Sequence, residues 1–267
     1  SCTLYAQWEP ITYTLVLDPN NGTAEPVSRS LRYGEEFCLP KETAGMAGYH
    51  ISAWSARPDG RGIAYAGGRT VKNLSYTDGA QVTLYGRWTA NSYTVVYHGS
   101  GAVSWERRQR FLYDRAANLA GNSFARTGYT FAGWSEEPEG TAKYTNMERV
   151  ENLTAEVDGI VDLYAVWKPI TYSVAFRANG ASGEMASAQY VYDRPDTLPE
   201  MTFTRPGFTF LGWSAYPYGK VMYAPGQEIK NLTYIQGRTV TLYALWEAHS
   251  YEIRFHGGKG ADGIPRD

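Results

Sequence analysis

Histidine most often binds metals or moves protons near neutral pH, so its occurrences are the first candidates for chemistry. The four histidines are His50, His98, His249 and His256, and no two of them have the spacing of a metal-binding helix motif. The sequence also lacks a serine nucleophile motif, a P-loop and a dinucleotide-binding turn. It therefore predicts no catalytic residue, no cofactor and no metal site, and we expect that the chain is not an enzyme.

A second candidate is the segment around Trp105, the one tryptophan that lies outside the repeated positions described below. It stands beside a strand-like run that contains Arg107, Arg108 and Arg110. Tryptophan and arginine dominate interface hot spots, so we take Trp105, Arg107, Arg108 and Arg110 as a candidate interaction patch for a protein or a polyanion. The alternative is a solvated edge strand whose charges discourage aggregation.

Aromatic side chains are unusually common, at 15% of the residues with 22 Tyr and 8 Trp. Exposed rings of this kind could stack on sugars, whereas buried rings would fill small cores. Most of them return at fixed positions along the chain, which favours core packing. The sugar-binding alternative stays open at this point.

Charge and hydropathy exclude two classes of partner. The formal net charge is −2, so no overall positive field attracts nucleic acid. No run of about 18 apolar residues appears, so we expect no membrane insertion within this segment. The two cysteines, Cys2 and Cys38, are too few for a disulfide framework. Cys2 occupies a position that holds valine elsewhere in the chain, which predicts a small buried side chain.

The elements that position these residues repeat along the chain. A strand-like hexamer ends at Trp8, Trp88, Trp167 and Trp246, which lie 80, 79 and 79 residues apart. A second motif couples a Gly-aromatic pair to a Trp-Ser pair, and a third opens each unit with a tyrosine. We therefore expect the following segments: 1–8 as the last strand of a preceding repeat, complete repeats at 13–88, 93–167 and 172–246, and 251–267 as the first strand of a following repeat.

The sequence pattern within each repeat predicts several short strands and little helix. Its opening segment alternates with period two, as in Tyr13, Leu15 and Leu17, which is typical of a half-buried strand. The segment from Leu39 to Gly48 is expected to be irregular or to hold one short helix. The spacing of Thr145 and Glu148 has the form of a capping box and predicts a helical turn. The Asn-Leu pairs that follow are interpreted as turns. The expected fold class is α+β, mostly β.

These motifs also resemble a known family. The residues from Gly128 to Trp134 (GYTFAGW) and from Leu163 to Trp167 (LYAVW), with their equivalents, are similar to the Listeria–Bacteroides repeat, which includes the B repeat of internalin B. The resemblance implies tandem β-grasp-like, ubiquitin-like modules arranged as an elongated array. It also implies a place on bacterial surface or secreted proteins, and it supplies no catalytic residue.

We therefore expect a non-catalytic segment of an extracellular, cell-surface or secreted bacterial protein. Its expected role is that of a spacer or stalk and of a protein-interaction, adhesion array. The alternatives are carbohydrate-binding modules that use exposed aromatic side chains, or an accessory region of a larger secreted enzyme. The expected partner is a host or cell-envelope protein or glycan, and the expected oligomeric state is a monomer.

Overall fold

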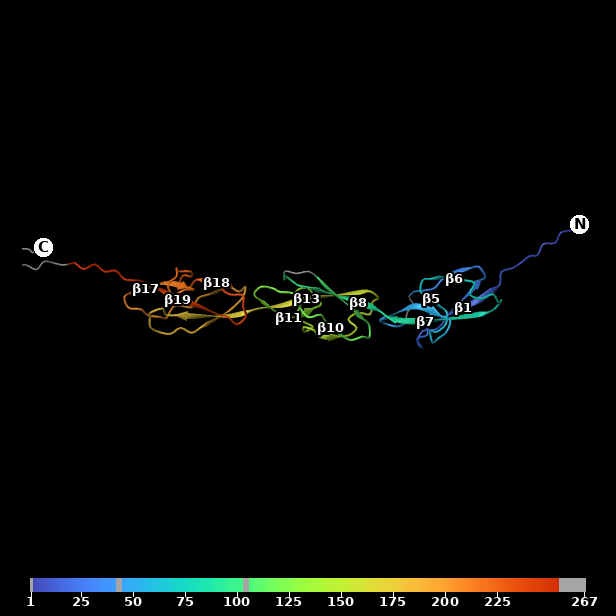
Figure 1. Ribbon diagram of the computed structural model, residues 1–267, viewed down its shortest axis with the longest axis horizontal. Coiled ribbons are helices and arrows are strands. Elements are labelled where there is room, and N and C mark those ends of the chain that lie inside the picture. Colours follow the sequence, from blue (N-terminus) through green and yellow to red (C-terminus); the bar gives the residue numbers. More distant parts are fainter. Residues whose placement is uncertain (1, 42–44, 103–105, 255–267) are drawn as a thin grey trace, which may run out of the picture. The chain divides into compact units, whose positions relative to one another are not determined.

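The computed structural model describes residues 2–41, 45–102 and 106–254 (Figure 1). The chain forms two compact units, the first made of Ser1–Phe124 and Ala132–Val166 and the second of Ala125–Phe131 and Trp167–Asp267. The described residues form strands, turns and irregular segments, and they contain no helix. The expectation of a mostly β chain is therefore confirmed.

The first sheet lies in the N-terminal part of the chain and has the strand order β2-β1-β7-β4-β5. Its strands are β1 (Thr12–Asp18), β2 (Val27–Arg32), β4 (Tyr49–Ser55), β5 (Ala64–Ala66) and β7 (Gln81–Ala90). A separate two-stranded sheet joins β3 (Glu36–Cys38) to β6 (Thr70–Lys72).

Two further sheets repeat this order. The second sheet, β11-β13-β8-β9, contains β8 (Ser92–His98), β9 (Arg107–Leu112), β11 (Tyr129–Ser135) and β13 (Gly159–Pro169). The third sheet, β15-β14-β19-β17, contains β14 (Thr171–Arg177), β15 (Ala188–Val191), β17 (Phe208–Ser214) and β19 (Thr239–Ala248). The small ladders β10 (Ala117–Asn118) with β12 (Arg149–Val150) and β16 (Asp196–Thr197) with β18 (Glu228–Ile229) accompany them.

In each sheet the opening and closing strands lie side by side and run parallel. Leu17 of β1 faces Leu84 of β7, and Phe176 of β14 faces Leu242 of β19. Parallel neighbours need a long crossover, and here the remaining strands of the repeat supply it. The period-two alternation predicted for the opening strands is confirmed, since Tyr13, Leu15 and Leu17 are all buried on one face.

A tryptophan fills the centre of each sheet's core. Trp54, Trp134 and Trp213 are each at most 1% exposed, and they come from the equivalent strands β4, β11 and β17. In the third sheet the ring of Trp213 packs 4.9 Å from that of Phe176 and 5.1 Å from that of Phe210, measured between ring centroids. Aromatic rings supply much buried area per residue, which suits a small fold that must form its core from few side chains.

The predicted helical turn at Thr145 is wrong, although its side-chain contact forms. Glu148 accepts hydrogen bonds from both the backbone N–H and the hydroxyl of Thr145, with its Oε2 at 2.7 and 2.9 Å. Met147 between them has φ 60°, which is left-handed and ends any right-handed helix. The pair therefore closes a tight turn. The segment from Leu39 to Gly48 is irregular in its described part.

The exposure of one cysteine differs from the expectation. Cys2 and Cys38 are both free and both exposed. The prediction of a buried Cys2 is wrong because none of the described strands pairs with the segment that holds it, whereas Val82, Val161 and Val240 belong to complete sheets.

Replacing Trp213 with alanine should lower the free energy of unfolding of the third sheet by about 3–5 kcal/mol, because it removes a fully buried ring and leaves a cavity. Denaturant unfolding followed through amide resonances of β14 and β19 measures the change. Trp8, which is 89% exposed, provides the matched control, and Trp8→Ala should change the unfolding free energy by less than about 0.5 kcal/mol. Equal effects of the two substitutions would contradict this account of the core.

Candidate functional site

The candidate patch around Trp105 is only partly described. Trp105 itself lies outside the described residues. The other members occupy β9, the edge strand of the second sheet, as the solvated-edge alternative anticipated. Arg107 pairs with Tyr97 on the core side of the sheet, whereas Arg108 and Arg110 pair with Val96 and Thr94 on the opposite side. The structure therefore divides the arginines between two faces.

Each of these arginines also contacts its own neighbours. Arg107 donates to the carbonyl oxygen of Gly121 at 3.0 Å, and Arg108 lies 3.3 Å from the carboxylate of Glu106. Arg110 donates to the hydroxyl of Ser92 at 2.6 Å. A role for Arg108 and Arg110 in binding a partner stays a prediction.

The three histidines in the described part of the chain each have a different contact partner. His98 Nε2 lies 2.7 Å from Asp162 Oδ1, and the ring stacks on that of Tyr164. His50 Nδ1 contacts Asn91 Oδ1 at 2.7 Å, whereas His256 lies outside the described residues. The described part of the chain contains no group of three or more His, Cys, Asp or Glu side chains that could hold a metal ion.

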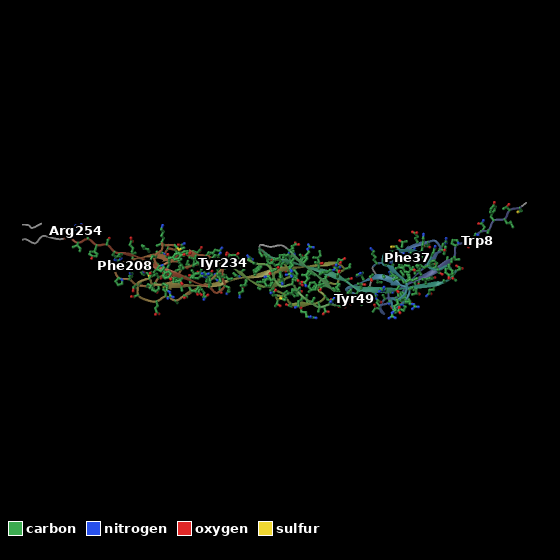
Figure 2. The ribbon with its side chains drawn as sticks, in the orientation of Figure 1. Trp8, Phe37, Tyr49, Phe208, Tyr234 and Arg254 are labelled. Atoms are coloured by element: carbon green, nitrogen blue, oxygen red, sulfur yellow. The ribbon has the colours of Figure 1, made fainter. Side chains whose placement is uncertain are left out.

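Most of the repeated tryptophans are buried or form hydrogen bonds within the fold. The three central ones are buried, so their faces cannot reach a sugar ring. Two of the tryptophans that close the repeats also bind within the fold, since Trp88 and Trp246 donate their indole N–H to the carbonyl oxygens of Pro19 and Ala178, at 2.7 and 2.9 Å. Trp8 differs, because it lies on the extended segment before β1 and is exposed (Figure 2).

A contact that the sequence did not reveal occurs twice. The hydroxyl of Tyr49 donates to Asp114 Oδ2 at 2.9 Å, within the first compact unit. The hydroxyl of Tyr129 donates to Asp193 Oδ2 at the same distance, within the second unit. We call each pair a tyrosine–aspartate contact. Tyr49 is labelled in Figure 2.

The rings beside these hydrogen bonds pack in the same way in both places. Tyr49 meets Tyr113 edge to face, with centroids 5.9 Å apart and planes at 73°. Tyr129 meets Tyr192 with centroids 5.9 Å apart and planes at 72°. Edge-to-face pairs of this kind add to the energy of area burial. The duplication shows that the contact belongs to the repeat.

A neighbouring asparagine holds each aspartate in place. Asn152 Oδ1 accepts the backbone N–H of Asp114 at 2.6 Å, and its amide donates to Asp114 Oδ1 at 2.7 Å. Asn231 binds Asp193 in the same way, at 2.7 and 2.8 Å. The two aspartates and the two asparagines all have positive φ, between 53° and 61°, which Asn and Asp tolerate better than most residues. The chain bends at Leu153 and Leu232, directly after the two asparagines, and each asparagine also orients a carboxylate.

A single residue between consecutive sheets bonds to both sides of the contact. The backbone N–H of Asn91 donates to the carbonyl oxygen of Gly48, and the N–H of Tyr113 donates to the carbonyl oxygen of Asn91, at 2.7 and 2.8 Å. Ile170 makes the same two bonds with Gly128 and Tyr192, each at 2.9 Å.

Electrostatics at the second contact favour the charged aspartate. The pKa of Asp193 lies below its ordinary value, mainly because Asn231 and then Tyr129 donate hydrogen bonds to the carboxylate. The pKa of Tyr129 is raised, first by desolvation and then by its bond to Asp193. Both shifts favour a neutral phenol donating to a negative carboxylate.

A signal for this contact was present in the sequence. The Gly-Tyr pair at Gly128 and the Tyr-Asp pair at Tyr192 each recur in the preceding repeat, at Gly48 and Tyr113. Period alone cannot reveal that these two pairs meet, because they are separated by more than 60 residues and belong to different repeats.

The sheets, their shared strand order and their recurring contacts define a tandem β-repeat protein. The sequence profile of the Listeria-Bacteroides repeat domain matches residues 93–166 and 172–245, which together cover more than half of the chain. The chain belongs to this family, as the motifs indicated.

Two relatives come from Evansella cellulosilytica. One, named "Putative Gly-rich membrane protein", is 28% identical over 217 residues, which are 80% of this chain and 24% of the relative. The other, named "Putative membrane protein", is 24% identical over 257 residues, which are 96% of this chain and 35% of the relative. The chain thus spans about a quarter to a third of these relatives. Within its own described residues, no helix has the length and hydropathy needed to cross a bilayer.

Replacing Gly128 with alanine should disrupt the second contact, because an added methyl group would overlap the ring of Tyr192. Gly207 provides a matched control, since its φ of 76° is close to the 78° of Gly128 but a methyl group there meets nothing within 4 Å. Both substitutions should carry a backbone cost of about 1 kcal/mol. Gly128→Ala should add a further loss, measured by denaturant unfolding and by shifts of the Tyr192 ring resonances. Equal losses at both glycines would contradict the contact.

Acid should weaken the tyrosine–aspartate contact between Tyr129 and Asp193. Because the folded pKa of Asp193 is lowered, its stabilising effect is fully present above the unfolded value of about 3.9 and is lost as the pH falls through the folded pKa. NMR titration of the Asp193 carboxyl carbon measures that pKa directly. Tyr129→Phe removes one donor and should move the Asp193 pKa upward toward the ordinary value. An unchanged titration in the variant would show that the hydrogen bond does not form.

Proposed function

We propose that this chain is a non-catalytic array of three modules, at 13–88, 93–167 and 172–246, which serves as a spacer and as a platform for protein interactions. The observation that carries the proposal is the repeated tyrosine–aspartate contact with its bonded linking residue. An array whose neighbours are coupled in the same way at each step can hold a distant domain away from its attachment point. An enzyme would instead need polar groups that converge in one cleft.

The fold supports this division into modules. We assign each module to a β-grasp-like fold, in which the opening and closing strands are parallel neighbours at the centre of a mixed sheet. Loops and short two-stranded ladders, in place of a long helix, cover the core face in the described residues. Each module has its own central tryptophan, which supports independent cores.

We assign the array to the outside of a bacterial cell, on the surface or in a secreted protein, and as a monomer. The two relatives named as membrane proteins support an envelope location, and this chain covers only part of each. A polypeptide with net charge −2 and exposed, mixed-sign side chains is suited to a partner that is a host or cell-envelope protein. The role in adhesion is part of this proposal.

Small-angle X-ray scattering of the chain tests the spacer role. A compact globule of 267 residues would have a radius of gyration of roughly 18 Å and therefore a maximum dimension of roughly 50 Å. Three modules in line, each about 30 Å across, would have a maximum dimension of roughly 90 Å. We expect the longer dimension at neutral pH. A maximum dimension near that of a compact globule would contradict the proposal. The variant Gly128→Ala, which should disrupt the contact between Tyr129 and Asp193, should broaden the distribution of interatomic distances obtained from the scattering.

A further inference from the structure

We propose that the open edge of β19 in the third sheet is a docking site for an extended peptide segment of a protein partner, bound by strand addition. This inference goes beyond the spacer role, because it names a site and the chemistry of its ligand. It depends on three observations in the second compact unit: an unpaired strand edge, a groove beside it, and a tyrosine at that groove, Tyr216, whose position holds arginine or glutamate in the other repeats.

The edge follows from the strand pairing. β19 pairs with β14 from Thr239 to Tyr243, but with β17 only from Tyr243 onward, where Ser214 ends that strand. The backbone N–H of Ser173 donates to the carbonyl oxygen of Arg238, which fixes the hydrogen-bond alternation of this parallel ladder. The N–H and C=O groups of Thr239 and Thr241 therefore point away from β14.

No strand covers these groups among the residues that the structure describes. The loop before β19 forms a backbone hydrogen bond within itself, from the N–H of Arg238 to the carbonyl oxygen of Ile235. An open groove of about 580 Å³ lies at this edge instead. A peptide that continued the line of β17 would satisfy the free donors and acceptors, as in other complexes formed by strand addition.

Tyrosines flank the groove on both sides. Tyr216 follows β17 and is 69% exposed. Tyr234, which is labelled in Figure 2, lies on the loop before β19 and is 67% exposed. Ile235 is exposed beside it, and Tyr243 of β19 also lines the groove. Large apolar surfaces that remain exposed beside an open strand edge are an aggregation risk, so their presence needs a function.

The second repeat supplies an internal comparison. Its residues at the positions of Tyr216, Ile235 and Thr241 are Glu137, Glu156 and Asp162. Carboxylates beside an edge repel the addition of a strand, as natural proteins use charges to protect their edges. The third repeat has uncharged side chains at all three positions, so its edge lacks the carboxylates of the second repeat.

Charge also indicates one feature of the ligand. Arg238 lines the groove, and none of the described residues that line it carries a carboxylate. We therefore assign the ligand as an extended peptide with apolar or aromatic side chains on alternate residues and at least one acidic residue that reaches Arg238. The backbone of the peptide supplies affinity, and the tyrosines supply the contacts for its side chains.

Selection of phage-displayed random linear peptides on the whole chain tests the site. We expect enrichment of acidic, alternating apolar sequences, and a synthetic peptide of the enriched sequence should protect the amides of Thr239 and Thr241 from hydrogen exchange. Tyr216→Glu and Tyr234→Ala, which place the side chains of the second repeat at these positions, should weaken binding at least tenfold, or about 1.4 kcal/mol. Both positions are exposed, so folding should be retained, and amide spectra verify this.

Tyr218 provides the matched control. It is 98% exposed and lies two residues from Tyr216, but it does not line the groove. Tyr218→Glu introduces the same charge and should leave peptide binding unchanged. Thr241→Pro is the second test of the edge itself, because it removes an N–H that points to the groove and should abolish binding while the β14 pairing remains.

Several results would overturn the proposal. One is the absence of any enriched peptide, and another is a peptide that binds Tyr216→Glu and Tyr218→Glu equally. Binding of cellohexaose or chitohexaose with the same mutational pattern would assign the groove to glycans instead. A concentration-dependent dimer that Tyr216→Glu disperses would assign it to a second copy of the chain. A compact scattering profile would refute the spacer role alone, so the two failures are distinguishable.

Discussion

The burial of one tryptophan under each small sheet is the constraint on which the rest of the structure depends. Trp54, Trp134 and Trp213 are the largest fully buried side chains among the described residues. A fold of under 80 residues buries a modest fraction of its surface, so a single ring carries a large share of its stability. In the third sheet, Phe176 of the opening strand β14 packs directly against that ring.

The recurring aromatic rings form the cores, so the residues that we propose to bind partners lie on loops and strand edges. The Gly-Tyr and Tyr-Asp pairs lie at the ends of the strands, where they join each repeat to its neighbour through Tyr49 and Tyr129. Tyr216 in the third repeat and Glu137 in the second occupy equivalent positions, and both side chains are exposed. The repeated contacts thus belong to the shared fold, whereas the proposed peptide site depends on a position that varies between repeats.

Sequence reasoning predicted the strands and the buried rings because both depend on local alternation and on period. It was wrong about the turn at Thr145, because a favourable side-chain pair forms equally well around the left-handed Met147. It missed the contact between Tyr129 and Asp193, since two residues that lie far apart in the chain meet only after folding. It grouped Arg107 with Arg108, although neighbours along a strand point to opposite faces.

Hydroxyl-radical footprinting of the whole chain, read out by mass spectrometry at each tryptophan, tests the central claim most directly. The account predicts that Trp54, Trp134 and Trp213 are protected under native conditions, that Trp8 is oxidised rapidly, and that denaturant makes all four equally reactive. Rapid native oxidation of the three central tryptophans, at rates similar to that of Trp8, would contradict it.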